Sequence, residues 1–192
     1  MKRFLLVFPG ILIFLLGTVH LIREANASDS VFKDFDNRIN FNTYNSSERE
    51  RESKEKISRF LIDMYNARLM VNEGGKLARE RGSTAKIRKY GNLMVMDQVI
   101  LEKKIEDLAK IKWVVISKNL SEENTKALSE LRMLNGESFD KKFTKMMKRD
   151  HRRDIRYLKM ASKYEDKEIS NFAEQTLPLI ESHRRTLRTI AK

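Results

Sequence analysis

The stretch SKEKISRFLIDMYNARLMVNEGGKLARER, residues 53–81, decides the fold class of this chain. Its apolar side chains recur at intervals of three and four residues, which is the period of one face of an α-helix. These side chains are Ile57, Leu61, Met64, Val71 and Ala78. Gly82 follows directly, and glycine is the residue that most often ends a helix. We therefore predict a helix over residues 54–81.

The same period recurs along the rest of the chain. It predicts long helices over residues 84–112, 138–163 and 167–190, with Asp166 as the cap of the last helix and a kink at Pro178. A shorter helix is expected over 122–134, because Ser121 is a favourable N-cap. We find no apolar–polar alternation typical of strands. Residues 53–192 are therefore predicted to form an all-α, antiparallel four-helix bundle with one additional short helix.

The N-terminus has the pattern of a secretion signal. Basic Lys2 and Arg3 precede an apolar run over residues 4–22, and Ala25-Asn26-Ala27 is a typical cleavage site. We predict a signal peptide over residues 1–27, cleaved after Ala27; retention of this run as a membrane anchor is the alternative. Both interpretations place the bundle outside the cytoplasm, in the periplasm or at the outer membrane. The polar residues 28–52 show no helical period and are interpreted as a flexible arm or linker.

The net charge and the lack of cysteine limit the classes of partner and the kinds of cross-link that the sequence allows. The net charge of the chain is +12, and removing residues 1–27, which carry three basic residues and one acidic residue, leaves +10. A surplus of this size favours anionic surroundings such as envelope polymers, a lipid surface or nucleic acid, and export argues against nucleic acid. The chain has no cysteine, which excludes disulfides and thiolate metal sites. The bundle must therefore be held together by its hydrophobic core.

Polar residues interrupt the apolar faces of the predicted helices at mid-height. They are Arg68 in the first long helix, Gln98 in the second, Asp150 and His151 in the third, and His183 in the fourth. A buried polar group without a partner costs about 1–3 kcal/mol. We therefore expect these five side chains to meet in one buried polar centre.

The same helices carry a family resemblance. Its motifs are Phe60 with Glu73-Gly74-Gly75-Lys76-Leu77-Ala78, Met94-Val95-Met96-Asp97, Phe139-Asp140, Met147 with Asp150-His151, and Thr176-Leu177-Pro178 with His183. In this order, over residues 57–190, the chain resembles domain-of-unknown-function family 4142. The resemblance implies a ferritin-like bundle and export, often with the description of a predicted outer-membrane protein. Two positions depart from the family pattern: Gln98 stands where the family usually has histidine, and Val71 where it commonly has glutamate.

Two interpretations of the polar centre remain open. A bundle interior can hold a divalent metal such as iron, manganese or zinc, usually on glutamates and Glu-x-x-His pairs. The candidate ligands here are Glu73, Asp97, Asp150, His151 and His183, although the chain has no Glu-x-x-His. The alternative is a structural hydrogen-bond network, which the replacement of a family histidine by Gln98 favours.

The third long helix is unusually basic. Its candidate docking residues for an anionic surface are Lys145, Lys148, Arg149, Arg152, Arg153 and Arg156. A solvated helix face is the alternative interpretation. No catalytic motif is evident. The leading hypothesis is an exported, non-enzymatic binding or structural module of the cell envelope, and the alternative is a metal-binding or oxidase-like protein. The oligomeric state does not follow from the sequence.

Overall fold

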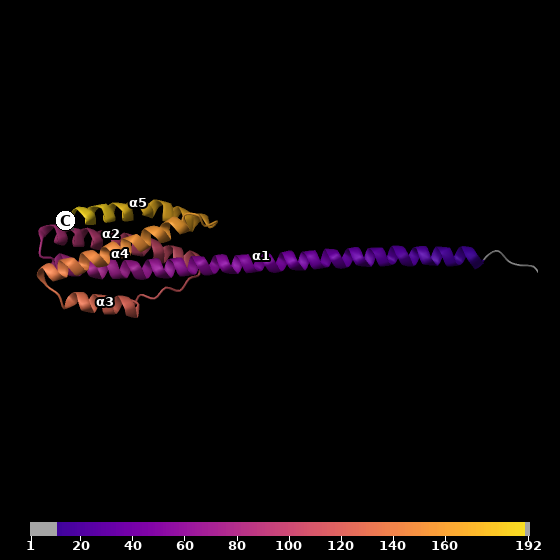
Figure 1. Cartoon of the computed structure of the whole chain (residues 1–192), viewed down its shortest axis with the longest axis horizontal. Coiled ribbons are helices and arrows are strands. Elements are labelled where there is room, and N and C mark those ends of the chain that lie inside the picture. The colour runs from indigo at the N-terminus through magenta and orange to yellow at the C-terminus, as the bar shows by residue number, and fades with distance from the viewer. Residues whose placement is uncertain (1–10, 191–192) are drawn as a thin grey trace, which may run out of the picture. The chain divides into compact units, whose positions relative to one another are not determined.

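The computed structural model describes the backbone of residues 11–190 and the side chains of residues 45–190. Its helices are α1 (Ile11–Arg81), α2 (Ala85–Ile111), α3 (Glu122–Arg132), α4 (Gly136–Ala161) and α5 (Lys167–Ile190), shown in Figure 1. No strand occurs within residues 11–190. The predicted all-α class and the additional short helix are confirmed. With the exception of the start of α1, each predicted helix end lies within two residues of the observed one.

Helix α1 differs from the sequence prediction at its beginning. Residues 28–52, expected to be an arm without regular structure, are helical and continuous with the part of α1 that enters the bundle. The chain divides between Ser53 and Lys54 into two compact units, the second of which is the bundle. Residues 1–10 of the predicted signal peptide lie outside the described residues. Among the helices that the structure describes, none contains an apolar stretch sufficient to cross a bilayer.

The direction of each helix follows from contacts at the two ends of the bundle. At one end, the backbone N–H of Ser83, just before α2, donates to Asp140 near the start of α4 at 3.0 Å. At the other end, Lys112, just after α2, pairs with Asp166, just before α5, at 2.6 Å. Helices α2 and α4 therefore run in the same direction, and each is antiparallel to its hairpin partner, α1 or α5. The connection that contains α3 returns the chain along the bundle, the topology with one long crossover found in ferritin-like folds.

Helices α1 and α2 approach each other closely at two glycines. A Cβ atom added to Gly91 would lie 2.6 Å from the carbonyl oxygen of Gly75 and 2.7 Å from the backbone nitrogen of Arg79. A Cβ atom added to Gly75 would lie 2.9 Å from the carbonyl oxygen of Gly91. The absence of side chains at both positions brings the two backbones into contact and fixes how α2 lies on α1.

The hydrophobic core consists of two clusters. The first, toward the start of the bundle part of α1, contains Ile57, Phe60, Leu61, Met64, Tyr65, Leu101, Ile105, Ala109, Ile155, Leu158, Ala161, Ile169, Phe172, Ala173 and Ile180. The second contains Met70, Val71, Leu77, Ala78, Ile87, Tyr90, Met94, Leu128, Leu131, Phe139, Phe143, Met146, Met147 and Leu187. Helix α3 contributes to the second cluster alone. The four long helices pass through both clusters and cross a polar region between them.

Candidate functional site

A layer of buried polar side chains occupies this central region, and we call it the polar layer. Its members are Arg68, Asn72, Gln98, Asp150, His151, Asp154, Thr176 and His183. Each is at most 9% exposed, and α1, α2, α4 and α5 all contribute. All five residues expected in the buried polar centre belong to it. Burying a polar group is unfavourable unless it is hydrogen-bonded, so the partners of these groups determine what the layer can do.

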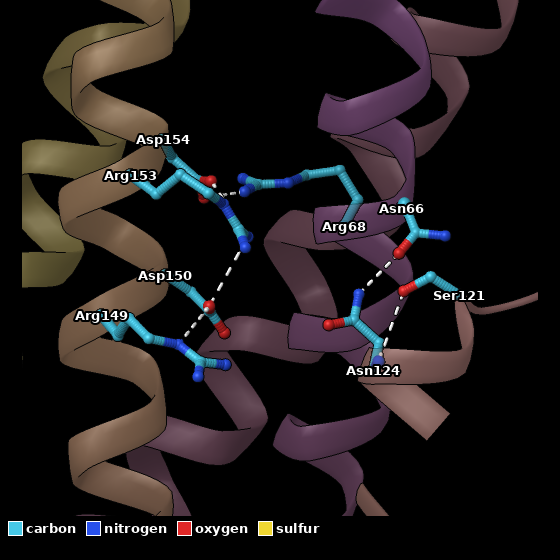
Figure 2. A network of polar contacts seen from close by, with 8 residues as sticks. All are labelled: Asn66, Arg68, Ser121, Asn124, Arg149, Asp150, Arg153 and Asp154. Atoms are coloured by element: carbon cyan, nitrogen blue, oxygen red, sulfur yellow. Dashed lines mark hydrogen bonds and ion pairs between the residues drawn. The ribbon is translucent and has the colours of Figure 1, made fainter. Parts of the chain in front are cut away.

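Two carboxylates of α4 are held by three guanidinium groups (Figure 2). Arg68 on α1 donates from Nη2 to Oδ2 of Asp154, and both side chains are fully buried. Arg153 places Nη2 at 3.5 Å from Oδ1 of Asp150 and at 3.6 Å from Oδ1 of Asp154. Nε of Arg149 lies 3.6 Å from Oδ1 of Asp150. The ion pairs therefore join α1 to α4 and reach from the bundle interior to its surface.

The two histidines of the bundle lie beside each other, with ring centroids 5.7 Å apart. Nε2 of His151 is 2.6 Å from the hydroxyl of Tyr90, which also faces the backbone carbonyl of His183 at 3.4 Å. Nε2 of His183 is 2.7 Å from Oδ2 of Asp97. Because a carboxylate can only accept, a neutral His183 carries its proton on Nε2, and its Nδ1 is an acceptor. Both rings are thus oriented by partners on α2.

Burial determines the protonation states of His151 and His183. Removal from water lowers the pKa of His151 to about 3, and the positive charge of Arg68 adds to the effect. Burial also lowers the pKa of His183, against the opposing influence of its hydrogen bond with Asp97. Burial raises the pKa of Asp150, and the charge of Arg153 counteracts this. Both histidines are therefore neutral at pH 7.

Many polar atoms of the layer have no hydrogen-bond partner within residues 45–190, although some of the carboxylate oxygens take part in the longer ion pairs described above. Among the described residues, the buried side-chain atoms without a hydrogen bond are Nε and Nη1 of Arg68, Oδ1 of Asn72, Oε1 and Nε2 of Gln98, both oxygens of Asp150, Oδ1 of Asp154, and Nδ1 of His151 and His183. They include donors and acceptors in close proximity. Small polar molecules such as water, which both donate and accept, can bridge these donors and acceptors. A ligand that carries charge of one sign matches them less well.

A second feature, an open groove, follows the basic face of α4. Its volume is about 1260 Å³ and it is bordered by the start of α2, by α3 and by α4. Of the six predicted docking residues, Lys145, Lys148, Arg149 and Arg152 line it. Arg153 instead turns toward the buried carboxylates. Arg156 also lies outside the lining, with its guanidinium carbon 5.9 Å from the ring centroid of Tyr157.

Comparison with known proteins places the chain in a family. Residues 43–190 match the model of the domain of unknown function DUF4142. The chain belongs to the DUF4142 family. This confirms the resemblance predicted from the sequence. No curated protein matches the chain.

Two solved structures share the fold of this DUF4142 protein. A DUF305 fragment from Deinococcus radiodurans is 15% identical, with a TM-score of 0.62, over 70% of this chain and 94% of that chain. The "putative secreted protein DUF305" from Streptomyces coelicolor is 13% identical, with a TM-score of 0.59, over 72% of this chain and 91% of that chain. At this level of identity the likeness concerns the fold alone.

The DUF4142 protein does not bring its five candidate metal ligands together. Glu73 lies at the surface, where it pairs with Lys76 at 2.7 Å and with Arg132 at 3.6 Å. Asp97 is bound to His183 and Asp150 faces arginines, as described above. Within residues 45–190, no three histidine, aspartate or glutamate side chains are arranged so that they could hold a metal ion. The residues present therefore do not fit a ferritin-type metal centre.

Several members of the site were not predicted from the sequence. Asp154 follows Asp150 by four residues and so lies on the same face of α4, which was a usable signal. Tyr90 precedes Met94 by four residues on the buried face of α2, but a tyrosine there is indistinguishable from an apolar core residue. Asn72 was not predicted either. Its Nδ2 donates to Glu102 of α2 at 3.0 Å, a pairing between helices that spacing within one helix does not reveal.

Proposed function

We propose that this DUF4142 protein is a non-enzymatic binding module of the cell envelope, with an anionic polymer as the ligand of the groove beside α4. One observation carries the proposal: three cations of the groove lining, Lys145, Lys148 and Arg152, are exposed and have no acidic partner among residues 45–190. Cations that are not neutralised within the protein are available to a negatively charged ligand.

The other charged residues of the groove do not neutralise these three cations. The other lining cations have partners: Lys141 pairs with Glu137 at 2.7 Å and Lys142 with Glu130 at 2.5 Å. The three unpaired cations are spaced three and four residues apart, so they share one face of α4 and extend over about 10 Å at a rise of about 1.5 Å per residue. A row of charges of this kind matches a ligand with repeated anionic groups better than a single small anion.

The envelope location rests on the sequence and on one neighbour. The signal-peptide pattern of residues 1–27 supports export to the periplasm or the outer membrane. The description of the Streptomyces coelicolor neighbour, which concerns secretion, is in agreement. In that compartment the available polyanions are polysaccharides and other charged envelope polymers, and nucleic acid is disfavoured.

A non-enzymatic role agrees with where the reactive side chains lie. His151 and His183 are at most 2% exposed, and Tyr90 is also 2% exposed. General acid–base chemistry requires such a group to reach the substrate directly or through one water. The lining of the groove contains no histidine, and its three carboxylates are engaged in other contacts. Glu130 pairs with Lys142, Glu137 pairs with Lys141, and Asp140 accepts hydrogen bonds from Ser83. The groove is therefore suited to binding, and the two histidines and Tyr90 are enclosed away from it.

Binding of fluorescein-labelled dextran sulfate to the full chain tests this proposal. The variant Lys145→Gln/Lys148→Gln/Arg152→Gln is expected to lose at least fivefold in affinity at low salt and to show a smaller dependence of affinity on salt. The control Lys163→Gln/Lys167→Gln/Arg185→Gln removes the same charge from exposed positions outside the groove and should lose less than twofold. Equal losses in the two variants would show that net charge alone attracts the polymer, and would refute a groove-specific site.

A further inference from the structure

The outer face of α2 carries an apolar patch that the bundle does not cover. Leu93, Met96, Val99 and Ile100 are 37%, 62%, 57% and 59% exposed, and we call them the α2 patch. Leu93, Met96 and Ile100 follow one another at spacings of three and four residues and so share one face of α2, and Val99 follows Met96 by three residues. The same stretch of α2 buries Met94, Gln98 and Leu101 on its inner side. The patch is thus additional to the face that α2 needs for packing.

Lysines flank the patch along the helix in both directions. Lys86 and Lys89 precede it, and Lys103 and Lys104 follow it, all exposed. Among residues 45–190, Lys86, Lys89 and Lys104 have no ion pair, whereas Lys103 pairs with Asp107 at 2.5 Å. The outer face of α2 therefore has an apolar centre between two positive ends.

The acidic residues of this stretch do not offset the lysines. The carboxylate of Asp97 is bound to His183 in the interior. The carboxylate of Glu102 accepts from Asn72 on α1 at 3.0 Å. Both acids are engaged in contacts with other helices, so the outer face of α2 over residues 86–104 has a net positive charge.

The charge pattern argues against a second copy of this chain as the occupant. A two-fold contact centred on the patch would place residues before the patch opposite residues after it in the partner. Lys86 and Lys89 would then approach Lys103 and Lys104 of the other copy, and like charges repel. Four exposed side chains also bury far less than the about 800 Å² per partner of a stable interface.

We propose that the outer face of α2 docks on an anionic lipid surface. An apolar centre with lysines around it is the arrangement by which a helix lies in the plane of a membrane interface, with apolar side chains below the headgroups and cations at the phosphates. The aliphatic and thioether side chains of the α2 patch enter the boundary between headgroups and acyl chains. Lys86, Lys89 and Lys104 contact the lipid phosphates. This surface belongs to α2 and is separate from the groove residues of α4.

A local probe of depth tests the proposal in the full chain. The chain has no cysteine, so Ile100→Cys introduces a single attachment point for a nitroxide label. Met160→Cys is the matched control, because Met160 on α4 is 51% exposed and lies outside the α2 patch. The vesicles contain phosphatidylcholine with 30% or with no phosphatidylglycerol. The local readout is needed because the N-terminal apolar run of the full chain could itself hold the protein on a vesicle.

The expected result is a change confined to the label at position 100. On vesicles with phosphatidylglycerol, collisions of this label with a water-soluble nickel reagent should fall at least threefold and collisions with oxygen should rise. The label at position 160 should remain as accessible to nickel as in solution. A label at position 100 that stays aqueous on bound protein would overturn the proposal. Spin–spin broadening at position 100 without lipid would also overturn it, because that signal indicates contact between two copies.

Vesicle binding by two double variants gives a second, independent measurement. Met96→Gln/Ile100→Gln should weaken binding to phosphatidylglycerol vesicles at least fivefold, whereas Met133→Gln/Met160→Gln should change it by less than twofold. All four positions are more than half exposed, so neither variant is expected to impair folding. Unchanged binding of the first variant, or equal binding of wild-type protein to neutral vesicles, would refute docking through the α2 patch.

Discussion

Arg68 on α1 and Asp154 on α4 pair at the centre of the bundle, where neither side chain is exposed to solvent. Around them lie the other members of the polar layer, with one apolar cluster on each side. Moving two charges out of water is costly, and a buried pair often contributes little net stability compared with apolar residues of similar size. The pair nevertheless makes the fold sensitive to the loss of either partner.

Removing one member of this pair should be more damaging than removing both. We expect Asp154→Asn to lower the free energy of unfolding by about 3–5 kcal/mol, because the guanidinium of Arg68 loses its buried counter-charge. The double variant Arg68→Met/Asp154→Leu should lie within about 1 kcal/mol of wild type. Urea denaturation measures all three. As a control, Glu55→Gln removes an acid that pairs with Arg59 at the surface and should cost less than about 0.5 kcal/mol. A double variant as unstable as Asp154→Asn would contradict the argument.

His151 should make the bundle acid-sensitive. Its pKa in the folded state is about 3 and about 6.5 in an unfolded chain. Between these values the unfolded state binds more protons, so stability falls as the pH drops. The expected loss from this residue is about 2 kcal/mol between pH 7 and pH 5. Chemical denaturation at several pH values measures the slope.

The matched variant for this test is His151→Gln, which keeps a polar side chain but cannot be protonated. Its stability at pH 7 is expected to be lower than that of wild type, so the slope is the informative quantity. Asp150 works in the opposite direction, because its raised pKa means that protonation relieves an unfavourable buried charge as the pH falls. Identical slopes for wild type and His151→Gln would show that His151 does not carry the effect.

Gly91 should not tolerate alanine. The added Cβ atom would meet the backbone of α1 below 3 Å at two atoms, and overpacking of this kind costs about 1–3 kcal/mol. Gly74→Ala is a matched control, because its Cβ would meet the flexible end of Met146 at 3.3 Å. Alanine is the better helix former by up to about 1 kcal/mol, so this variant should be neutral or stabilising. Thermal unfolding compares them, and equal effects would refute the close helix contact.

Metal ions should have no specific effect on stability. No group of three ligands is assembled among residues 45–190. An ion that binds the folded state alone would raise its stability by an amount that grows with the ratio of the ion's concentration to its dissociation constant. We expect the midpoint of thermal unfolding to change by less than about 1 °C with EDTA or with micromolar zinc, manganese or iron(II). A rise of several degrees that disappears in His151→Ala/His183→Ala would instead support the metal-binding alternative.

Helix positions in the bundle could be predicted because local and tertiary preferences agree there. The apolar period, Ser121, Asp166 and the turn at Gly82 all act within a few residues, and helical ends were placed within two residues from α2 onward. Residues 28–52 were different. Their polar composition and lack of an apolar stripe indicated an arm, yet they form helix in continuity with α1. An apolar stripe indicates that a helix packs against a core. Its absence from residues 28–52 is therefore no argument against helix formation there.

The membership of the polar layer could be predicted in part. Spacing along single helices identified Gln98, His151 and His183, since each interrupts an apolar stripe. It could not show that Glu73, near the same height, turns to Lys76 and Arg132 on the outside. Nor could it show that Arg153 faces inward while its neighbour Arg152 lines the groove. Such choices depend on the rotation of each helix and on which helices are neighbours, and these are properties of the assembled bundle.

The polar layer has a consequence for the alignment of the helices. If α1 slid along α4 by one turn, about 5.4 Å, Arg68 would leave Asp154 and its charge would enter an apolar cluster. A core made only of leucine and methionine would offer many similar alignments, whereas a single layer of matched charges permits one. The layer thus fixes the axial register of the helices, that is, how far each one is shifted along the bundle relative to its neighbours. In this way it positions the outward-facing surfaces of α2 and α4 at defined heights on the bundle.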